Sequence, residues 1–231
     1  CGNFLIVAYR ELRVLEIEVF KEIYPSNQLQ LDVNILSSVT VDQFYGIELN
    51  HFAVRIAKIA MWLVDHQMNQ ALSDLYGISY IRIPIHDSGK IIRENALTYD
   101  WKLLIDPKEC NYILGNPPFV GPRFMTKEQK DNLLNLFSGV KGNGDLDFVS
   151  CWFLKASNFI DKSNTRVAFV STNSITQGEQ VGILWNELIN NKKIDIFFAH
   201  RTFKWTIDEK RVSGMHIANV LVVIIGFNKN D

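Results

Sequence analysis

The chain reads Tyr-Ile-Leu-Gly-Asn-Pro-Pro-Phe over residues 112–119, a short apolar run followed at once by two prolines. The apolar run predicts a buried strand, and proline ends that strand abruptly because it has a fixed φ angle and no amide hydrogen. Asn116 therefore stands just beyond the end of a strand. Ligands bind at this carboxyl edge in open α/β sheets, so we expect the chemistry of the protein to centre here.

Apolar strands and helices alternate on both sides of this stretch. Strands are predicted over residues 41–49, 91–97, 112–114, 166–171, 194–199 and 217–227. Helices are predicted over residues 4–22, 51–69, 127–137, 148–160 and 182–190, with Asn50 capping the second and an irregular segment over 72–88. Because several strands are apolar on both faces, the pattern predicts an α/β fold with a doubly wound, mostly parallel sheet covered by helices.

The turn at residues 116–119 is suited to hold an aromatic amino group. Pro117 and Pro118 supply no amide donors, so the Asn116 side-chain oxygen and the nearby main-chain carbonyls form a rigid cluster of acceptors. Hydrogen bonds from both amino hydrogens, to Asn116 and to the Pro117 carbonyl, would favour a pyramidal nitrogen with an exposed lone pair. Phe119 can stack on the ring. The alternative is a kinked loop with a buried phenylalanine.

Three further segments lie where a strand ends or a helix begins. Residues 1–3 precede the first helix, and Gly2 there lets the main chain approach a ligand near the helix amides. Glu48 stands at a strand end, where a carboxylate can accept both hydroxyls of a ribose. Residues 95–97 offer the Asn95 amide, which can read an adenine edge. A simple turn stays open as the alternative for residues 1–3 and 95–97, and a solvated glutamate or a helix cap for Glu48.

These segments resemble the motifs of S-adenosylmethionine-dependent DNA methyltransferases that methylate amino groups. The signature of that family, [N/D/S]-P-P-[F/Y/W], corresponds to residues 116–119. Four segments resemble cofactor motifs: the tail of the cofactor loop D-P-A-C-G-x-G-N-F at 1–4, the ribose-binding motif at 46–49, the adenine-side motif at 95–97 and a further cofactor-pocket motif at 146–149. Residues 167–174 resemble the next strand and loop, and residues 199–205 resemble the segment that carries the base-stacking aromatic.

The order of these motifs is similar to that of the gamma class of N6-adenine methyltransferases. The resemblance implies a Rossmann-like methyltransferase fold lacking its first strand, S-adenosylmethionine as methyl donor, no metal, and methylation of a flipped adenine in double-stranded DNA. It implies catalytic roles for Asn116, Pro117, Pro118 and Phe119, and base stacking by Phe203 or Trp205. The implied cofactor-binding residues are Cys1, Gly2, Asn3, Phe4, Glu48, Leu49, Asn95, Ala96, Leu97, Asn116, Asp147 and Phe148.

The resemblance also predicts how residues 1–231 are organised. They form one methyltransferase domain, with a cofactor half at about 1–110 and a catalytic half at about 111–231. Residues 2–13 and 198–205 are similar to single-chain type II (IIG or IIL) restriction-modification proteins. We therefore expect this domain to be part of a longer polypeptide that carries a target-recognition domain and, where the system requires it, a nuclease domain.

Three alternatives to an adenine-specific enzyme stay open. Methyltransferases that act on N4 of cytosine use the same acceptors, usually with Ser or Asp where Asn116 stands. Related Asn-Pro-Pro enzymes methylate RNA bases or a protein glutamine amide. From a different class, the chain would be a non-catalytic scaffold with a degenerate cofactor site.

Composition narrows the setting in which the chain works. The 24 basic and 25 acidic side chains give a formal net charge of −1, which argues against strong DNA binding by these residues alone and assigns most phosphate contacts to another domain. Three cysteines without a C-x-x-C pair indicate a reducing compartment, and no apolar run approaches the ~18 residues of a membrane helix. The reducing compartment predicts a cytoplasmic protein. The five histidines show no metal-ligand spacing, so we expect no metal site.

Overall fold

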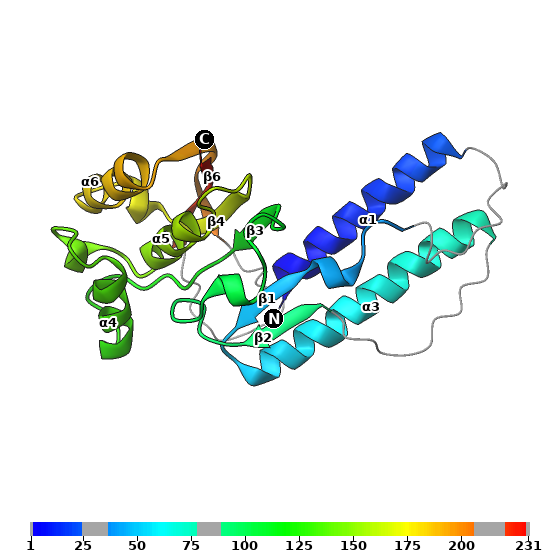
Figure 1. The fold of residues 1–231 in the computed structure, drawn as a ribbon, viewed down its shortest axis with the longest axis horizontal. Coiled ribbons are helices and arrows are strands. Elements are labelled where there is room, and N and C mark those ends of the chain that lie inside the picture. The colour runs from blue at the N-terminus through cyan, green and yellow to red at the C-terminus, as the bar shows by residue number, and fades with distance from the viewer. Residues whose placement is uncertain (1, 25–36, 78–88, 206–219, 230–231) are drawn as a thin grey trace. The chain divides into compact units, whose positions relative to one another are not determined.

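The computed structural model describes residues 2–24, 37–77, 89–205 and 220–229. These residues divide into two compact units, Cys1–Asp100 and Trp101–Asp231 (Figure 1). Each unit has its own sheet, two-stranded in the first and four-stranded in the second. The units are described separately below.

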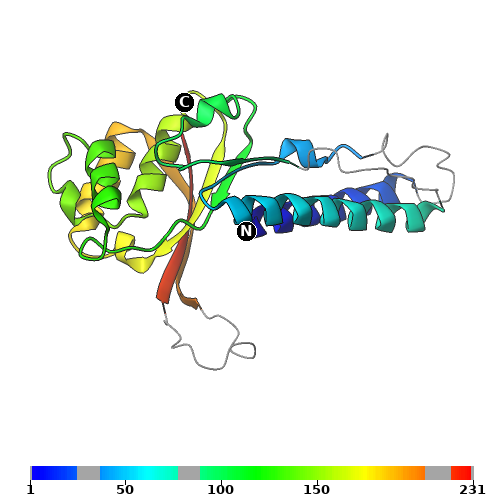
Figure 2. The ribbon, with the colours of Figure 1, turned by 90° about the horizontal axis from the view of Figure 1, so that it is seen from below.

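Unit 1 combines a small parallel sheet with two long helices. Strands β1 (Tyr45–Glu48) and β2 (Lys90–Arg93) pair in parallel, and a short 3-10 helix, Val41–Gln43, precedes β1. Helices α1 (Asn3–Ile23) and α3 (His51–Tyr76) lie side by side, as Figures 1 and 2 both show. Apolar side chains from both helices and from the sheet form one buried core, which includes Tyr9, Ile17, Val54, Met61, Leu72 and Ile91.

Helix α3 begins where the sequence predicts and ends later. The Asn50 side chain accepts hydrogen bonds from the amides of Phe52 (2.8 Å) and Ala53 (3.2 Å), which confirms the predicted cap. The predicted end at residue 69 and the irregular segment from residue 72 are wrong, because the helix continues to Tyr76. Leu72 and Tyr76 maintain the apolar helical spacing and are both buried.

A buried polar network links α1 to α3. The Tyr9 hydroxyl donates to Asp65 Oδ1 at 2.6 Å, and Asn69 Nδ2 donates to the same oxygen at 3.0 Å. Arg13, only 1% exposed, donates from Nη2 to Asn69 Oδ1 at 2.8 Å and from Nη1 to the Val39 carbonyl at 3.0 Å. Charged groups at this depth require such partners, because an unpaired buried charge is strongly destabilising.

The sheet of unit 2 has the strand order β3-β4-β6-β5. Strand β3 (Tyr112–Gly115) pairs in parallel with β4 (Arg166–Thr172), whereas β6 (Val220–Lys229) pairs antiparallel with both β4 and β5 (Ile194–Trp205). The parallel pairings of β1 with β2 and of β3 with β4 agree with the predicted α/β class. Residues 217–219 of the last predicted strand lie outside the described residues.

The described residues of unit 2 form three α-helices, and an aromatic cluster packs one of them on the sheet. The helices are α4 (Lys127–Leu136), α5 (Ser150–Phe159) and α6 (Gln180–Trp185), and a π-helical segment, Asn186–Asn191, completes the helix predicted over 182–190. Phe153 of α5 lies 5.4 Å from Phe169, 5.5 Å from Phe227 and 5.9 Å from Trp185, measured between ring centroids. Short 3-10 helices occur at Trp101–Leu103, Asn143–Asp145 and Asn173–Thr176. Within the described ranges, no helix is long and apolar enough to cross a membrane.

Candidate functional site

The turn at residues 116–119 leaves the sheet beside the end of β4. Gly115 is in register with Phe169 in the parallel β3–β4 pair, so residues 116–119 and 170–174 emerge at the same carboxyl edge. A Cβ on Gly115 would lie 3.1 Å from the Phe169 ring, so glycine allows β3 to approach that ring closely. The packing of Phe169 thereby fixes the point at which the turn begins.

The four residues of the turn differ in exposure. Pro117 is buried, Phe119 is half-buried, and Asn116 and Pro118 are exposed. The buried proline anchors the turn while the Asn116 amide stays accessible. This arrangement leaves an amide oxygen and neighbouring carbonyls available as acceptors on a fixed backbone.

The loop after the turn is attached to the segment that carries Asp147. The Phe148 amide donates to the Val120 carbonyl at 2.9 Å. Asp147 Oδ1 lies 3.7 Å from where a Cβ on Gly121 would stand. Residues 147 and 148 therefore contact the chain directly after Phe119.

Asp147 gathers hydrogen bonds from two other segments. Its Oδ2 accepts from Thr172 Oγ1 (3.3 Å), from Ser174 Oγ and from Gln180 Nε2 (3.3 Å), while its amide donates to Gln180 Oε1 (3.1 Å). The side chain is 8% exposed. Oδ2 takes all three side-chain hydrogen bonds, and Oδ1 lies against Gly121. Phe148 is buried and packs edge-on against Trp152 at 5.2 Å.

Of the predicted cofactor residues in unit 1, Glu48, Leu49 and residues 95–97 lie at or after the carboxyl ends of β1 and β2. Glu48 ends β1, and its carbonyl accepts from the Glu94 amide at 3.2 Å, so the two strand ends are adjacent. The Glu48 carboxylate accepts from the Asn50 amide at 3.0 Å, and Leu49 is exposed. Asn95 Oδ1 accepts from the Leu97 amide at 3.0 Å, which closes a turn around Ala96 and places Leu97 in the interior.

Gly2 begins helix α1 in a conformation and a space that exclude a side chain. Its φ angle is +74°, and a Cβ would lie 2.8 Å from Ala57 Cβ. Asn3 and Phe4 form the exposed start of the helix, whereas Cys1 lies outside the described residues. Gly2 therefore lets the start of α1 pack closely against Ala57 of α3.

The two predicted base-stacking residues lie on strand β5. Phe203 pairs in register with Val222 and Trp205 with Val220, and their ring centroids are 6.3 Å apart. Phe203 is 37% exposed and Trp205 is half-buried. The strand was predicted to end at residue 199, but β5 continues to Trp205 through a register shift between His200 and Phe203.

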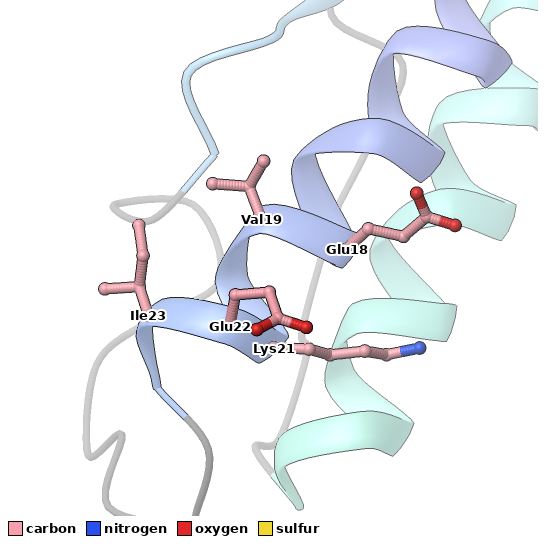
Figure 3. Close-up of a pocket in the computed structure, with 5 residues that line it drawn as sticks. All are labelled: Glu18, Val19, Lys21, Glu22 and Ile23. Carbon is pink, nitrogen blue, oxygen red and sulfur yellow. The ribbon is translucent and has the colours of Figure 1, made fainter.

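A surface pocket elsewhere in unit 1 contains none of the predicted site residues. It lies on the last turns of α1 (Figure 3), and its lining residues are Glu18, Val19, Lys21, Glu22 and Ile23. In the part of the chain that the structure describes, no cluster of three or more His, Cys, Asp or Glu side chains is placed to hold a metal ion.

Comparison with known proteins shows the family. All 231 residues match the family model "MmeI, DNA-methyltransferase domain". The chain belongs to the MmeI DNA-methyltransferase domain family. This membership confirms the resemblance to the methyltransferase part of restriction-modification enzymes that the motifs predicted.

Relatives of this MmeI-family domain support the assignment. DNA methyltransferase A of Bacillus subtilis (strain 168) is 41% identical over 233 residues, which cover 100% of this chain and 26% of the relative. The type IIL restriction-modification enzyme MmeI, solved in complex with DNA, is 48% identical with a TM-score of 0.91, over 100% of this chain and 30% of that one. The domain thus spans less than a third of either relative.

A more distant structure shares the fold of the MmeI-family domain. The ATP-dependent type ISP restriction-modification enzyme LlaBIII, solved bound to DNA, is 15% identical with a TM-score of 0.57, over 99% of this chain and 16% of that one. Together with MmeI, it places this chain in the Rossmann-like α/β methyltransferase fold predicted from the sequence.

Sequence reasoning missed how this MmeI-family domain surrounds Asp147. It assigned Asp147 by motif, yet the donors Thr172, Ser174 and Gln180 lie 25 to 33 residues further along the chain. No local spacing connects such residues. The sequence does place Thr172 at the end of a strand parallel to β3, and Ser174 just after it.

Proposed function

We propose that this chain transfers a methyl group from S-adenosylmethionine to N6 of an adenine flipped out of double-stranded DNA, as the modification domain of a restriction-modification protein. The observation that carries the proposal is the exposed Asn116 amide on a turn anchored by buried Pro117 at the carboxyl end of β3. Family membership supports DNA as the substrate class.

The proposed reaction depends mainly on orientation. The adenine leaves the base stack because N6 cannot be reached within the duplex. Asn116 Oδ1 and the Pro117 carbonyl accept its two amino hydrogens, which directs the nitrogen lone pair outward and stabilises the positive charge that develops on N6. Phe119, with Phe203 or Trp205, holds the ring by stacking. Positioning of this kind contributes up to about 7–11 kcal/mol in favourable cases.

The residues expected to hold S-adenosylmethionine have suitable chemistry. When bound, this cofactor supplies a methyl group activated by a sulfonium. The carboxylate of Glu48 suits ribose hydroxyls, and the first amides of α1, after Gly2, have no helical acceptors and can approach a ligand. Leu49 and residues 95–97 would contact the adenosine, with Asn3, Phe4, Asp147 and Phe148 as further contacts. No metal enters the proposed reaction.

Adenine is favoured over cytosine because an asparagine occupies the first position of the signature. Methyltransferases specific for N4 of cytosine usually carry Ser or Asp there, by the resemblance given above. RNA and protein glutamine remain outcomes of the test, as does a non-catalytic scaffold.

We propose further that the chain is one domain of a longer polypeptide. It spans 26% of DNA methyltransferase A and 30% of MmeI. Target recognition, any nuclease activity and most contacts with DNA phosphates would then belong to other domains of that polypeptide, which acts in the cytoplasm.

Replacing Asn116 tests the proposal. In the full-length protein, Asn116→Ala removes one of the two acceptors, so we expect methylation to fall below a tenth of the wild-type level while cofactor binding persists. Mass spectrometry of nucleosides from treated DNA measures the product, and calorimetry with S-adenosylmethionine measures binding. Wild-type protein should yield N6-methyl-2′-deoxyadenosine.

Asn111→Ala is the matched control. Asn111 is also exposed and lies just before β3, where its carbonyl accepts from the Arg166 amide. Truncating its side chain should leave methylation unchanged. Methylation above a tenth of wild type by Asn116→Ala would contradict the role of Asn116, and N4-methylcytosine, methylated RNA or methylglutamine as the product would contradict the assigned substrate. Absence of cofactor binding by wild type would favour the scaffold.

A further inference from the structure

Asp147 is a buried carboxylate held by neutral donors. It is 8% exposed, and among the described residues the side chains that hydrogen-bond to it are those of Thr172, Ser174 and Gln180. No charged side chain of the described residues pairs with it, and the charged neighbours Asp145 and Glu179 are exposed. A carboxylate in such surroundings depends on the complete set of its hydrogen bonds.

Gln180 makes the most specific of these contacts. Its Nε2 donates to Asp147 Oδ2 at 3.3 Å, and its Oε1 accepts from the Asp147 amide at 3.1 Å. One amide group therefore holds both the side chain and the main chain of Asp147. A side-chain amide offers this donor and this acceptor side by side without carrying a charge.

The Asp147 segment in turn holds the loop of the signature turn. The amide of Phe148, the next residue, donates to the Val120 carbonyl at 2.9 Å, and Val120 directly follows Phe119. Asp147 Oδ1 also lies against Gly121. A shift of residues 147 and 148 would therefore displace the turn that carries Asn116 and Phe119.

We propose that Gln180 is a positioning residue for methyl transfer, acting through Asp147 to fix the turn at residues 116–119. This inference rests on the proposed function. Gln180 touches neither the base nor the cofactor; it sets the geometry of the groups that do. A displacement of about 1 Å in such groups can reduce the rate about a hundredfold.

Two substitutions of Gln180 in the full-length protein test this role. Gln180→Leu removes both hydrogen bonds, so we expect kcat to fall about 10- to 100-fold, while KM for S-adenosylmethionine and for DNA changes less than about threefold. Gln177→Leu is the control, because Gln177 is an exposed glutamine in the segment just before α6.

Gln180→Glu adds a readout that a purely structural role would not move. The new glutamate side chain faces the Asp147 carboxylate. Repulsion between the two negative charges raises the pKa of the new glutamate. Above that pKa the two charges repel; below it, the protonated glutamic acid donates to Asp147 Oδ2 and still accepts from the Asp147 amide. We therefore expect the kcat of Gln180→Glu, relative to wild type, to rise as pH falls from about 8.5 to 6, while the ratio for Gln180→Leu stays flat.

The outcomes separate the two proposals. Full kcat in Gln180→Leu, a raised KM for S-adenosylmethionine with unchanged kcat, or a flat pH ratio for Gln180→Glu would each overturn the positioning role. Wild-type protein that is active and sensitive to Asn116→Ala upholds the proposed function in every one of those cases. Wild-type protein without methyltransferase activity would overturn both.

Discussion

In the signature turn, Gly115 serves packing and Asn116 offers the hydrogen-bond acceptor. Gly115 lets β3 lie against Phe169, and a Cβ there would come within 3.1 Å of that ring. Asn116 then emerges with its amide exposed, while Pro117 is buried. A larger residue at 115 would displace the Asn116 side-chain oxygen while leaving its chemistry intact. Gly115 would therefore matter to the proposed methyl transfer although it has no reactive group.

Cys151 provides a residue-scale prediction. It lies in α5 and is fully buried, and desolvation raises the pKa of its thiol to about 12. Because the thiolate is the reactive form, we expect iodoacetamide to label Cys151 in the native protein very slowly between about pH 7 and 9, and rapidly after unfolding in urea. Peptide mapping by mass spectrometry measures both rates.

Cys110 is the internal comparison for that experiment. It is half-buried, and burial also raises the pKa of its thiol, but its sulfur is closer to solvent. We expect Cys110 to react faster than Cys151 in the native state. Equal native rates at the two positions would contradict the burial of Cys151.

At this scale the sequence predicted contiguous motifs better than dispersed contacts. Asn116 and its neighbours could be assigned because four adjacent residues carry both the turn and the acceptors. The glutamine that holds Asp147 could not, because it lies 33 residues away and its contact exists only after folding. For the same reason Arg13 was missed, since its partner Asn69 is 56 residues distant.

At the scale of elements, the α1–α3 pair depends on its buried charges. Arg13 is 1% exposed and bonds both Asn69 and the Val39 carbonyl, and it lies 3.4 Å from Glu16. Glu16 accepts from the amides of Ser38 and Val39, so the same group of side chains also holds the approach to β1. Removing one member would leave several polar groups without partners.

Arg13→Leu should therefore destabilise the protein substantially. We expect a loss of about 3–5 kcal/mol in the free energy of unfolding, because the substitution breaks a buried charged network. Urea unfolding followed by circular dichroism measures it. Arg10→Leu is the matched control: Arg10 is exposed, and its ion pair with Glu11 contributes at most about 1 kcal/mol. Similar losses for the two variants would contradict the role of the network.

Element types could be predicted more reliably than element ends. The apolar periodicity identified α1, β3, α4, α5 and β4 within a few residues of their observed bounds. The late ends of α3 and β5 were missed for different reasons. Helix α3 continues because Leu72 and Tyr76 reach the core, whereas β5 continues because β6 supplies a partner strand that no local pattern reveals.

At the scale of the whole molecule, both the net charge and the length of the chain favour a protein in which other domains make most of the DNA contacts. The formal net charge is −1 over 231 residues, and the chain spans less than a third of DNA methyltransferase A and of MmeI. Attraction to DNA grows with the number of phosphates that a protein neutralises. Under the proposed function, most phosphate contacts would therefore belong to other domains of the polypeptide.

We therefore expect residues 1–231 alone to bind duplex DNA at least about tenfold more weakly than the full-length protein at 150 mM salt. Fluorescence anisotropy with a labelled duplex measures both affinities, and circular dichroism of the separate domain verifies that it is folded. Equal affinities would show that this domain carries the phosphate contacts itself.

Strand β5 has a consequence for how the protein behaves at high concentration. It closes one end of the four-stranded sheet and exposes Ile196, Phe197 and Phe198, features that invite a second copy to add its own strand. Register shifts after Ile196 and after His200 interrupt the strand, and Arg201 and Lys204 place positive charges along it. An irregular and charged edge strand discourages pairing with a second copy. Removing the register shifts from β5 would therefore favour aggregation.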